Sequence, residues 1–340
     1  MPLTLEALET LDTIARKGSF AAAAAELGKV PSALTYTVRR LEDDLDVLLF
    51  DRRGARAELT AAGKVLLEEG RRLLHSADAL TRRVRRVASG WETELRIAVD
   101  ALIDFGLLRP LIEDFYRLAA PTRLRFSHEV LDGAWESLLQ GRADLVIGAS
   151  HEAPSPAIAA ARFSMRPMGR VNWVFCVAPH HRLAQAPEPL SDETLREHRA
   201  VALADTARLQ ATRSSGLLCG QETLTVATLD QKVALQIAGV GVGVGWLPEP
   251  FARTPLACGR LVARRTAEPR PPVVLHYAWQ RSDPGQALRW WLERLEPQRV
   301  RARLIDGPQA APLPESAPPK PVRRGSPATA LRTPRRSVPR

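Results

Sequence analysis

The sequence has few cysteines and few aromatic residues, and it contains no long hydrophobic run. Its 340 residues include three cysteines, and aromatic residues account for 5%. Cys176, Cys219 and Cys258 are too few and too widely spaced for a disulfide framework or a zinc cluster, so we interpret them as reduced thiols. No apolar stretch reaches the roughly 18 residues of a membrane-spanning helix, and the N-terminus does not resemble a secretion signal. We therefore expect a soluble, cytoplasmic protein.

The sequence also lacks the motifs that would indicate an enzyme, a metal site or a cofactor site. It has no GxSxG nucleophile elbow, and His180 and His181 have no further ligand at metal-binding spacing. The glycine-rich segment 239–243 follows a predicted helix, whereas a dinucleotide-binding loop follows a strand. We therefore predict that the chain is not an enzyme and has no catalytic residues, metal or cofactor.

Positive charge is in excess, with a formal net charge of +10. Much of it lies in residues 307–340, which contain seven Lys or Arg and one Glu, a difference of 7 − 1 = +6, together with nine prolines. Such a segment has too few apolar residues to fold, so we predict a disordered tail. Two roles remain open for it, sequence-independent DNA affinity and no role at all.

The stretch 18–60 has the pattern of two short helices joined by a tight turn and followed by a two-stranded wing. Ser19 suits the N-cap of the first helix, Gly28 suits its end, and Pro31 fits the first position of the second helix. In the second helix, an apolar stripe on one face predicts packing against a core. The stripe consists of Leu34, Val38, Leu41 and Leu45.

The opposite face of this second helix carries small, polar and basic side chains. Such a face can enter the major groove and contact bases and phosphates. An ordinary amphipathic helix with a solvated face is the alternative, but a basic wing beside the helix favours DNA binding. The residues predicted to contact DNA are Ser19, Ser32, Ala33, Thr35, Tyr36, Arg39 and Arg40, with Arg52, Arg53 and Arg56 in the wing.

Residues 61–90 are predicted to form one long helix. Leucine or valine recurs there every seven residues, which is typical of two paired helices. Packing of this seam against the chain's own domain is the alternative. A two-fold DNA site needs two copies of a major-groove helix, so we expect a homodimer or homotetramer. The seam consists of Leu66, Leu73, Leu80 and Val87.

From about residue 91, short apolar runs alternate with helical patterns, which predicts βαβ units around parallel strands. The order predicts two α/β lobes, lobe I at about 91–163 and 268–298 and lobe II at about 164–267. The chain would cross between them near 162–166 and 264–270. The predicted strands are 95–99, 122–130, 144–148, 172–178, 200–204, 224–227 and 273–280, and the predicted helices are 106–118, 132–140, 192–198, 229–238 and 286–295.

In such sheets, small ligands bind beyond the C-terminal ends of the strands, between the lobes. The strand ends here offer polar groups, apolar walls and an aromatic ring, which suits a small neutral or weakly polar aromatic molecule. Capping of a loop or helix is the alternative role for Asp100 and Asp205. The residues predicted to bind an effector are Asp100, Ala101, Leu102, Ser150, Asp205, Thr206 and Trp246.

Segment 5–67 resembles the winged helix-turn-helix of LysR-type transcriptional regulators. The matching pieces include Gly18-Ser19-Phe20, Ser32-Ala33-Leu34-Thr35, Arg39-Arg40-Leu41-Glu42, Leu49-Phe50-Asp51-Arg52 and Ala62-Gly63. The family usually has Ser and Gln where this chain has Val30 and Pro31, and often Arg where Tyr36 stands, so the operator sequence does not carry over.

The resemblance implies an α+β multidomain fold. It would comprise a winged helix-turn-helix DNA-binding domain at 1–60, a dimerisation linker helix at 61–90 and a two-lobed α/β periplasmic-binding-protein-like effector domain at 91–306. The tail at 307–340 has no counterpart in the family pattern.

The second half resembles the YhaJ-like subgroup of this family, in pieces such as Val130-Leu131-Asp132-Gly133-Ala134-Trp135-Glu136 and Gly141-Arg142-Ala143-Asp144. The resemblance implies a sequence-specific transcriptional activator that responds to an aromatic, quinol-like effector. Its implied partners are double-stranded DNA, the effector, further copies of the chain and RNA polymerase, and no membrane.

Overall fold

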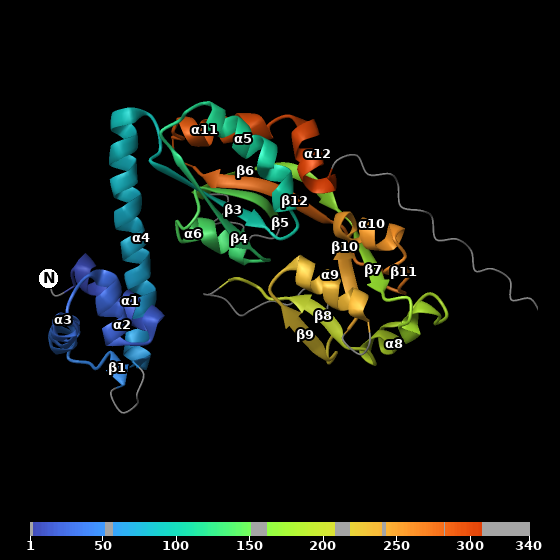
Figure 1. The fold of residues 1–340 in the computed structure, drawn as a ribbon, viewed down its shortest axis with the longest axis horizontal. Coiled ribbons are helices and arrows are strands. Elements are labelled where there is room, and N and C mark those ends of the chain that lie inside the picture. The colour runs from blue at the N-terminus through green and yellow to red at the C-terminus, as the bar shows by residue number, and fades with distance from the viewer. Residues whose placement is uncertain are drawn as a thin grey trace, which may run out of the picture. The chain divides into compact units, whose positions relative to one another are not determined.

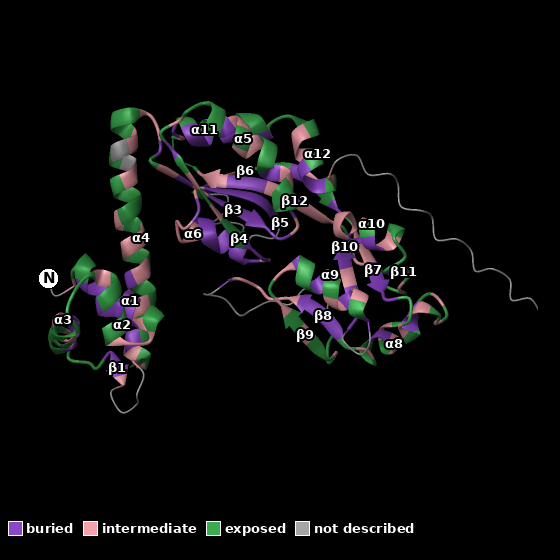
Figure 2. Ribbon diagram, in the orientation of Figure 1, coloured by how far each residue is buried: buried purple, intermediate pink, exposed green. Residues whose placement is uncertain are grey.

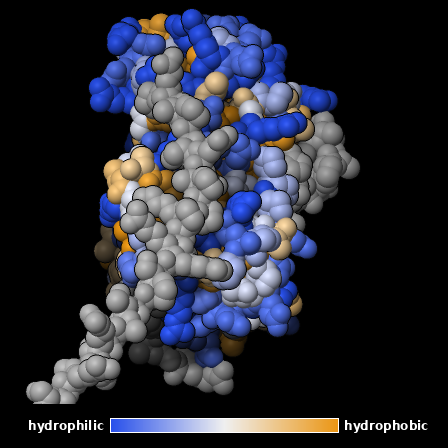
Figure 3. Space-filling model, turned by 90° about the vertical axis from the view of Figure 1, so that its right-hand side faces the viewer, coloured by the Kyte–Doolittle hydropathy of each residue, from blue (hydrophilic) through white to orange (hydrophobic). Residues whose placement is uncertain are grey.

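A computed structural model of the chain describes residues 3–51, 57–150, 162–207, 218–239, 243–281 and 283–307, apart from the side chains at 83 and 85 (Figure 1). A helical N-terminal domain is followed by one long helix and then by α/β units. Within these residues, no helix is both long and apolar enough to cross a membrane. On the face shown in Figure 3, hydrophobic residues are scattered among hydrophilic ones.

The N-terminal domain consists of three helices and a short two-stranded wing, and the last two helices and the wing lie where the sequence predicts them. The Ser19 side chain accepts a hydrogen bond from the Ala22 N–H at the start of the second helix, and Gly28 ends that helix with a left-handed φ of 64°. The apolar stripe of the third helix packs into the core of the domain. The elements are α1 (Leu5–Lys17), α2 (Phe20–Leu27), α3 (Pro31–Leu45), β1 (Phe50–Asp51) and β2 (Glu58–Leu59).

Buried contacts attach the wing to α3 and to the long helix. The Glu42 side chain is buried, and its Oε1 accepts hydrogen bonds from the N–H groups of Leu49 and Phe50, at 2.8 and 3.3 Å. Gly63, in the first turn of α4 (Ala61–Ser89), lies so close to the wing that a Cβ there would be 2.1 Å from the Leu49 carbonyl oxygen. The wing therefore begins at a fixed position between two helices.

Helix α4 is the continuous helix that the sequence predicts. The Thr60 side chain accepts a hydrogen bond from the Gly63 N–H at its start, and Gly90 ends it with a φ of 74°. Helix α4 packs against α1, and Arg71 Nε of α4 lies 2.6 Å from Asp12 Oδ1 of α1. Much of its surface is exposed (Figure 2), including Leu73, Leu80, Val84 and Val87.

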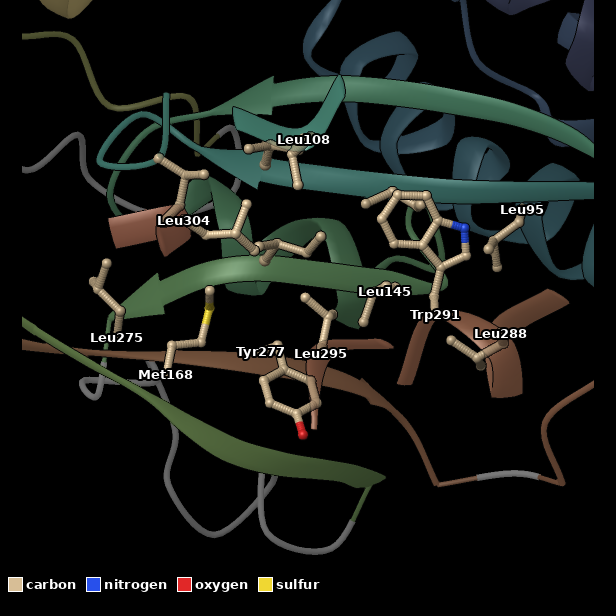
Figure 4. Close-up of a cluster of buried hydrophobic side chains, with 14 of the residues drawn as sticks. Leu95, Leu108, Leu145, Met168, Leu275, Tyr277, Leu288, Trp291, Leu295 and Leu304 are labelled. Carbon is tan, nitrogen blue, oxygen red and sulfur yellow. The ribbon is translucent and has the colours of Figure 1, made fainter. Parts of the chain in front are cut away.

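Lobe I is a five-stranded mixed sheet with the order β4-β3-β5-β12-β6. Helices α5, α11 and α12 cover one face of the sheet and α6 covers the other (Figure 1). Trp291 is fully buried, close to Leu95 and Leu288 in the core (Figure 4). The elements are β3 (Glu94–Asp100), η1 (Phe105–Leu108), α5 (Arg109–Arg117), β4 (Arg123–Glu129), α6 (Gly133–Leu139), β5 (Leu145–Ser150), β6 (Phe163–Val171), β12 (Val273–Gln280), α11 (Gln286–Leu295) and α12 (Gln298–Asp306).

Lobe II combines an antiparallel sheet of order β10-β7-β11 with the parallel pair β8-β9. A bridge between Ala200 and Val244 connects β8 to the residue before β10. The elements are β7 (Trp173–Val177), η2 (Arg182–Ala184), α8 (Asp192–Arg196), β8 (Ala200–Leu203), β9 (Thr223–Val226), α9 (Leu229–Ala238), β10 (Gly245–Pro248), α10 (Glu249–Ala257) and β11 (Val262–Arg264).

The first crossing between the lobes lies later than predicted. Strand β6 pairs with β12 along its whole length, so lobe I extends to Val171 and the chain crosses at Asn172, not near 162–166. Pro167 and Gly169 interrupt the apolar pattern of β6, and an edge strand tolerates both. This interruption explains why the sequence does not indicate the strand.

Candidate DNA-binding surface and effector site

The outward face of α3 presents the side chains that the sequence predicts for DNA contact. Ser32, Arg39 and Arg40 are exposed, and Tyr36 is 67% exposed (Figure 2). Ala33 and Thr35 are half-buried. The opposite face of the helix is buried in the core at Leu34, Val38 and Leu41.

The two arginines of this face differ from three other cations of the domain in having no partner among the described residues. Arg39 and Arg40 form no hydrogen bond or ion pair with any described residue. By contrast, Arg16 and Lys17 both pair with Glu26, and Lys29 pairs with Glu6. A guanidinium that no described residue engages is available to a phosphate.

Two of the smaller predicted contacts have local roles. The Thr35 hydroxyl donates to the Pro31 carbonyl oxygen at 3.0 Å, which leaves its oxygen lone pairs and methyl group for a base. Ser19 uses its hydroxyl as the N-cap of α2. The wing arginines Arg52, Arg53 and Arg56 lie outside the described residues.

In the second half of the chain, polar groups meet at the C-terminal ends of three strands. Asp100 at the end of β3 pairs in register with Glu129 at the end of β4. Thr206, just after β8, donates from Oγ1 to Glu129 Oε2 at 2.7 Å and accepts from the Val130 N–H at 2.9 Å. These contacts join lobe I to lobe II. Because the sequence predicts a ligand-binding crevice at this place, we name the region the interlobe crevice.

Asp100 is the most perturbed carboxyl of the interlobe crevice. Its side chain is 4% exposed, and Oδ1 accepts a hydrogen bond from the Leu102 N–H at 2.9 Å. Burial, opposed by that hydrogen bond and assisted by the nearby charges of Glu129 and Asp205, raises the pKa of Asp100 to about 7. Asp100 and Asp205, both predicted from sequence, are therefore close enough to affect each other's charge, and Thr206 contacts Glu129 beside them.

Apolar groups form another part of the crevice. Ala101 is buried with Val130 of lobe I and Leu229 of lobe II, and Leu102 packs against the same cluster. The predicted residues Ala101 and Leu102 thus lie beside the polar group.

Ser150 and Trp246 have different surroundings from this group. The Ser150 carbonyl oxygen, at the end of β5, accepts a hydrogen bond from Trp135 Nε1 at 2.9 Å. Trp246 packs edge-on against Phe175, with ring centroids 5.5 Å apart, and lines a separate cavity in lobe II. The aromatic ring expected in the crevice is therefore in another part of its lobe.

Sequence reasoning did not find Glu129 and Arg142. Arg142 Nη1 lies 3.0 Å from Glu129 Oε1, and Glu129 is 4% exposed. The available signal was an acidic residue near the end of the predicted strand 122–130. Within the described residues, no three His, Cys, Asp or Glu side chains converge as a metal site would require.

Two family patterns match the chain over separate ranges. The bacterial regulatory helix-turn-helix domain of the lysR family matches residues 5–64, and the LysR substrate binding domain matches residues 88–299. The uncharacterized HTH-type transcriptional regulator YeeY of Escherichia coli K12 is 42% identical over 291 residues, covering 86% of this chain and 92% of its own length. The probable HTH-type regulator YhaJ of the same strain is 43% identical over 295 residues, with 86% and 96% covered.

The fold also matches a solved full-length regulator. Full-length CbnR, in a crystal structure with its target DNA, matches 88% of this chain and 100% of its own with a TM-score of 0.53, at 20% identity. The two family patterns, the curated relatives and this fold agree with the helix-turn-helix and the two lobes described above. The chain belongs to the LysR family of bacterial DNA-binding transcriptional regulators, with an effector-binding domain after its helix-turn-helix.

Proposed function

We propose that this regulator is an activator that reads its operator through the outward face of α3 and responds to a small aromatic or quinol-like effector in the interlobe crevice. The exposure of this face supports the proposed reading of DNA. Tyr36, Arg39 and Arg40 are exposed, and the two arginines have no described partner. Activation is supported by AllS of Klebsiella pneumoniae, named a transcriptional activator, at 34% identity over 76% of this chain and 94% of its own.

The proposed active form is a homodimer or homotetramer in the cytoplasm. Its support is α4, which exposes Leu73, Leu80 and Val87 at heptad spacing. Two paired copies would present two α3 helices to a two-fold operator, and an activator bound there would contact RNA polymerase.

The binding residues can be tested by electrophoretic mobility shift with the full-length protein on its own upstream DNA and on random DNA. The double variant Thr35→Ala/Tyr36→Ala should lose roughly tenfold or more of its affinity for the upstream site, because base contacts carry about 1–3 kcal/mol each, and should keep its affinity for random DNA. Tyr116→Ala, which removes an exposed tyrosine from α5, is the matched control. An equal loss on both DNAs would contradict the proposal.

A second candidate function is general DNA coating by the basic segment 307–340, which carries a charge of 7 − 1 = +6. Deleting residues 308–340 distinguishes the two. Coating predicts that binding is lost on both DNAs, whereas operator reading predicts that the preference for the upstream site survives.

A further inference from the structure

Thr206 of lobe II makes three hydrogen bonds to the end of β4 in lobe I. Its Oγ1 donates to Glu129 Oε2 at 2.7 Å and accepts from the Val130 N–H at 2.9 Å. Its own N–H donates to the Val130 carbonyl oxygen at 3.3 Å. A hydrogen bond to a carboxylate is stronger than one between neutral groups, so the hydroxyl is a firm connection between the lobes.

Lobe I leaves space for this hydroxyl at Gly133, the first residue of α6. A Cβ placed on Gly133 would lie 1.8 Å from Thr206 Oγ1 and 2.9 Å from Glu129 Oε2. Any other residue at this position would therefore fill the space that the hydroxyl occupies. We name the place formed by Glu129 Oε2, the Val130 N–H and Gly133 the hydroxyl seat.

The Glu129 carboxylate is oriented by lobe I itself. Its Oε1 accepts from Arg142 Nη1 at 3.0 Å and from the Ser127 hydroxyl at 3.3 Å, so Oε2 is the oxygen that meets Thr206. The contacts to Arg142 and Ser127 do not involve lobe II. The acceptor of the hydroxyl seat is therefore in place whether or not Thr206 occupies it.

An apolar cluster beside the hydroxyl seat also joins the lobes. Ala101 and Val130 of lobe I are buried with Leu229 of lobe II, and Phe251 of lobe II packs against them. Apolar contacts are non-directional, whereas a hydrogen bond weakens steeply when its geometry changes. Loss of the Thr206 hydroxyl should therefore loosen the crevice while the lobes stay in contact.

The hydroxyl seat selects one kind of chemical group. It requires an atom that donates to Glu129 Oε2 and also accepts from the Val130 N–H, and a hydroxyl does both. A carboxylate would be repelled by Glu129 and by Asp100, which pairs with Glu129 in register. An ammonium cannot accept a hydrogen bond and an ether cannot donate one. The seat therefore fits an alcohol or a phenol.

We propose that the Thr206 hydroxyl closes the crevice of the free chain by occupying the hydroxyl seat, and that a hydroxyl of the effector replaces it there. This inference rests on the proposed function, which places the effector in the interlobe crevice. The effector binds only those molecules in which Thr206 has left the seat, so the closure lowers its apparent affinity. Removal of the Thr206 hydroxyl should then strengthen effector binding, whereas direct contact between Thr206 and the effector predicts the opposite.

Hydrogen exchange of the Val130 amide in the free full-length chain tests the closure without effector or DNA. In Thr206→Ala this amide should exchange roughly tenfold faster or more, because Thr206 Oγ1 accepts its hydrogen bond. Thr206→Ser keeps the hydroxyl and should keep the wild-type protection. Thr225→Ala, at an exposed threonine of β9, is the matched control and should leave the exchange unchanged.

Wild-type protection of Val130 in Thr206→Ala would overturn the closure and would leave the proposed reading of DNA as it stands. If Thr206→Ala does not fold, Thr206→Val removes the hydroxyl with little change of shape and should show the same faster exchange.

Calorimetric titration of the same proteins with hydroquinone tests the replacement. Thr206→Ala should bind hydroquinone about threefold more tightly than the wild type or better, and Thr206→Ser should bind it as the wild type does. The control ligand is 1,4-dimethoxybenzene, which has the same ring but no donor for Glu129. It should bind Thr206→Ala roughly tenfold more weakly than hydroquinone does.

The outcomes separate this inference from the proposed function. Hydroquinone binding to Thr206→Ala that is weaker than or equal to binding by the wild type would overturn the replacement. Faster Val130 exchange in Thr206→Ala without hydroquinone binding to any of the proteins would support the closure and contradict the quinol-like effector.

Discussion

The outward face of α3 and the interlobe crevice place their functional groups in opposite environments. On α3, Tyr36 is 67% exposed and the arginines have no described partner. In the crevice, Asp100 and Glu129 are each 4% exposed, and Glu129 is bonded to Thr206 and Arg142. A face that binds a large polyanion can stay solvated in the free protein at little cost to stability. A site for a small molecule must keep polar groups buried even when no ligand is bound, and this burial costs stability.

Asp100→Asn should have the largest effect, because it removes the buried carboxyl on which this contrast rests. It should change how the free energy of unfolding depends on pH. The pKa of Asp100 rises from 3.8 to about 7 on folding, so this carboxyl's contribution to stability is full below about pH 4 and lost as pH rises to 7. Above pH 7 the ionised group costs on the order of 4 kcal/mol. The variant, whose amide oxygen can still accept from the Leu102 N–H, should be more stable by an amount approaching this figure.

Thermal unfolding of wild type and variant from pH 4 to pH 8.5 measures the difference. It should be absent at pH 4 and grow with pH. Asp104→Asn, at an exposed carboxyl in the same loop, is the control and should show no such trend. A constant difference across the range would show that the burial of Asp100 imposes no cost of ionisation.

Gly63→Ala should destabilise the N-terminal domain without changing the outward face of α3. The added Cβ would lie 2.1 Å from the Leu49 carbonyl oxygen and 2.9 Å from Leu59 Cδ2, so the start of the wing must shift, at a cost of about 1–3 kcal/mol. Denaturant unfolding followed by circular dichroism measures this cost. Gly70→Ala, whose closest contact is the flexible end of Leu8, should cost less, and equal costs for the two would contradict the account of the wing.

Arg39→Ala/Arg40→Ala should have the smallest and least specific effect. If both guanidiniums contact phosphates, the slope of log affinity against log salt should fall by roughly one per arginine, equally on operator and random DNA. Fluorescence anisotropy across a salt series measures the slope. Arg16→Ala, which removes an arginine already paired with Glu26, should leave it unchanged, and a loss confined to the operator would assign base reading to these arginines instead.

Elements with a regular hydrophobic pattern could be predicted from sequence, and two short helices could not. The predicted bounds of α9 (Leu229–Ala238), β12 (Val273–Gln280) and α11 (Gln286–Leu295) are those of the structure. By contrast, α10 contains Pro255 and α12 begins directly after Pro297, and neither was predicted. Both helices are short, so tertiary packing decides them more than local propensity.

The same difference separates the two proposed sites. The proposed DNA-binding face follows from helical periodicity, because one apolar stripe fixes which residues point outward. The crevice depends on contacts across 77 positions, such as that between Glu129 and Thr206, and no local pattern specifies them. The position of Trp246 likewise depends on which face of β10 packs against Phe175.

Protection of guanine N7 from dimethyl sulfate on the chain's own upstream DNA tests the central claim most directly, because N7 lies in the major groove. We expect the wild type to protect guanines in two half-sites about one helical turn apart. Thr35→Ala/Tyr36→Ala should lose that protection at concentrations where it still binds DNA. Protection by the double variant identical to that of the wild type would contradict the claim that this face of α3 reads the operator.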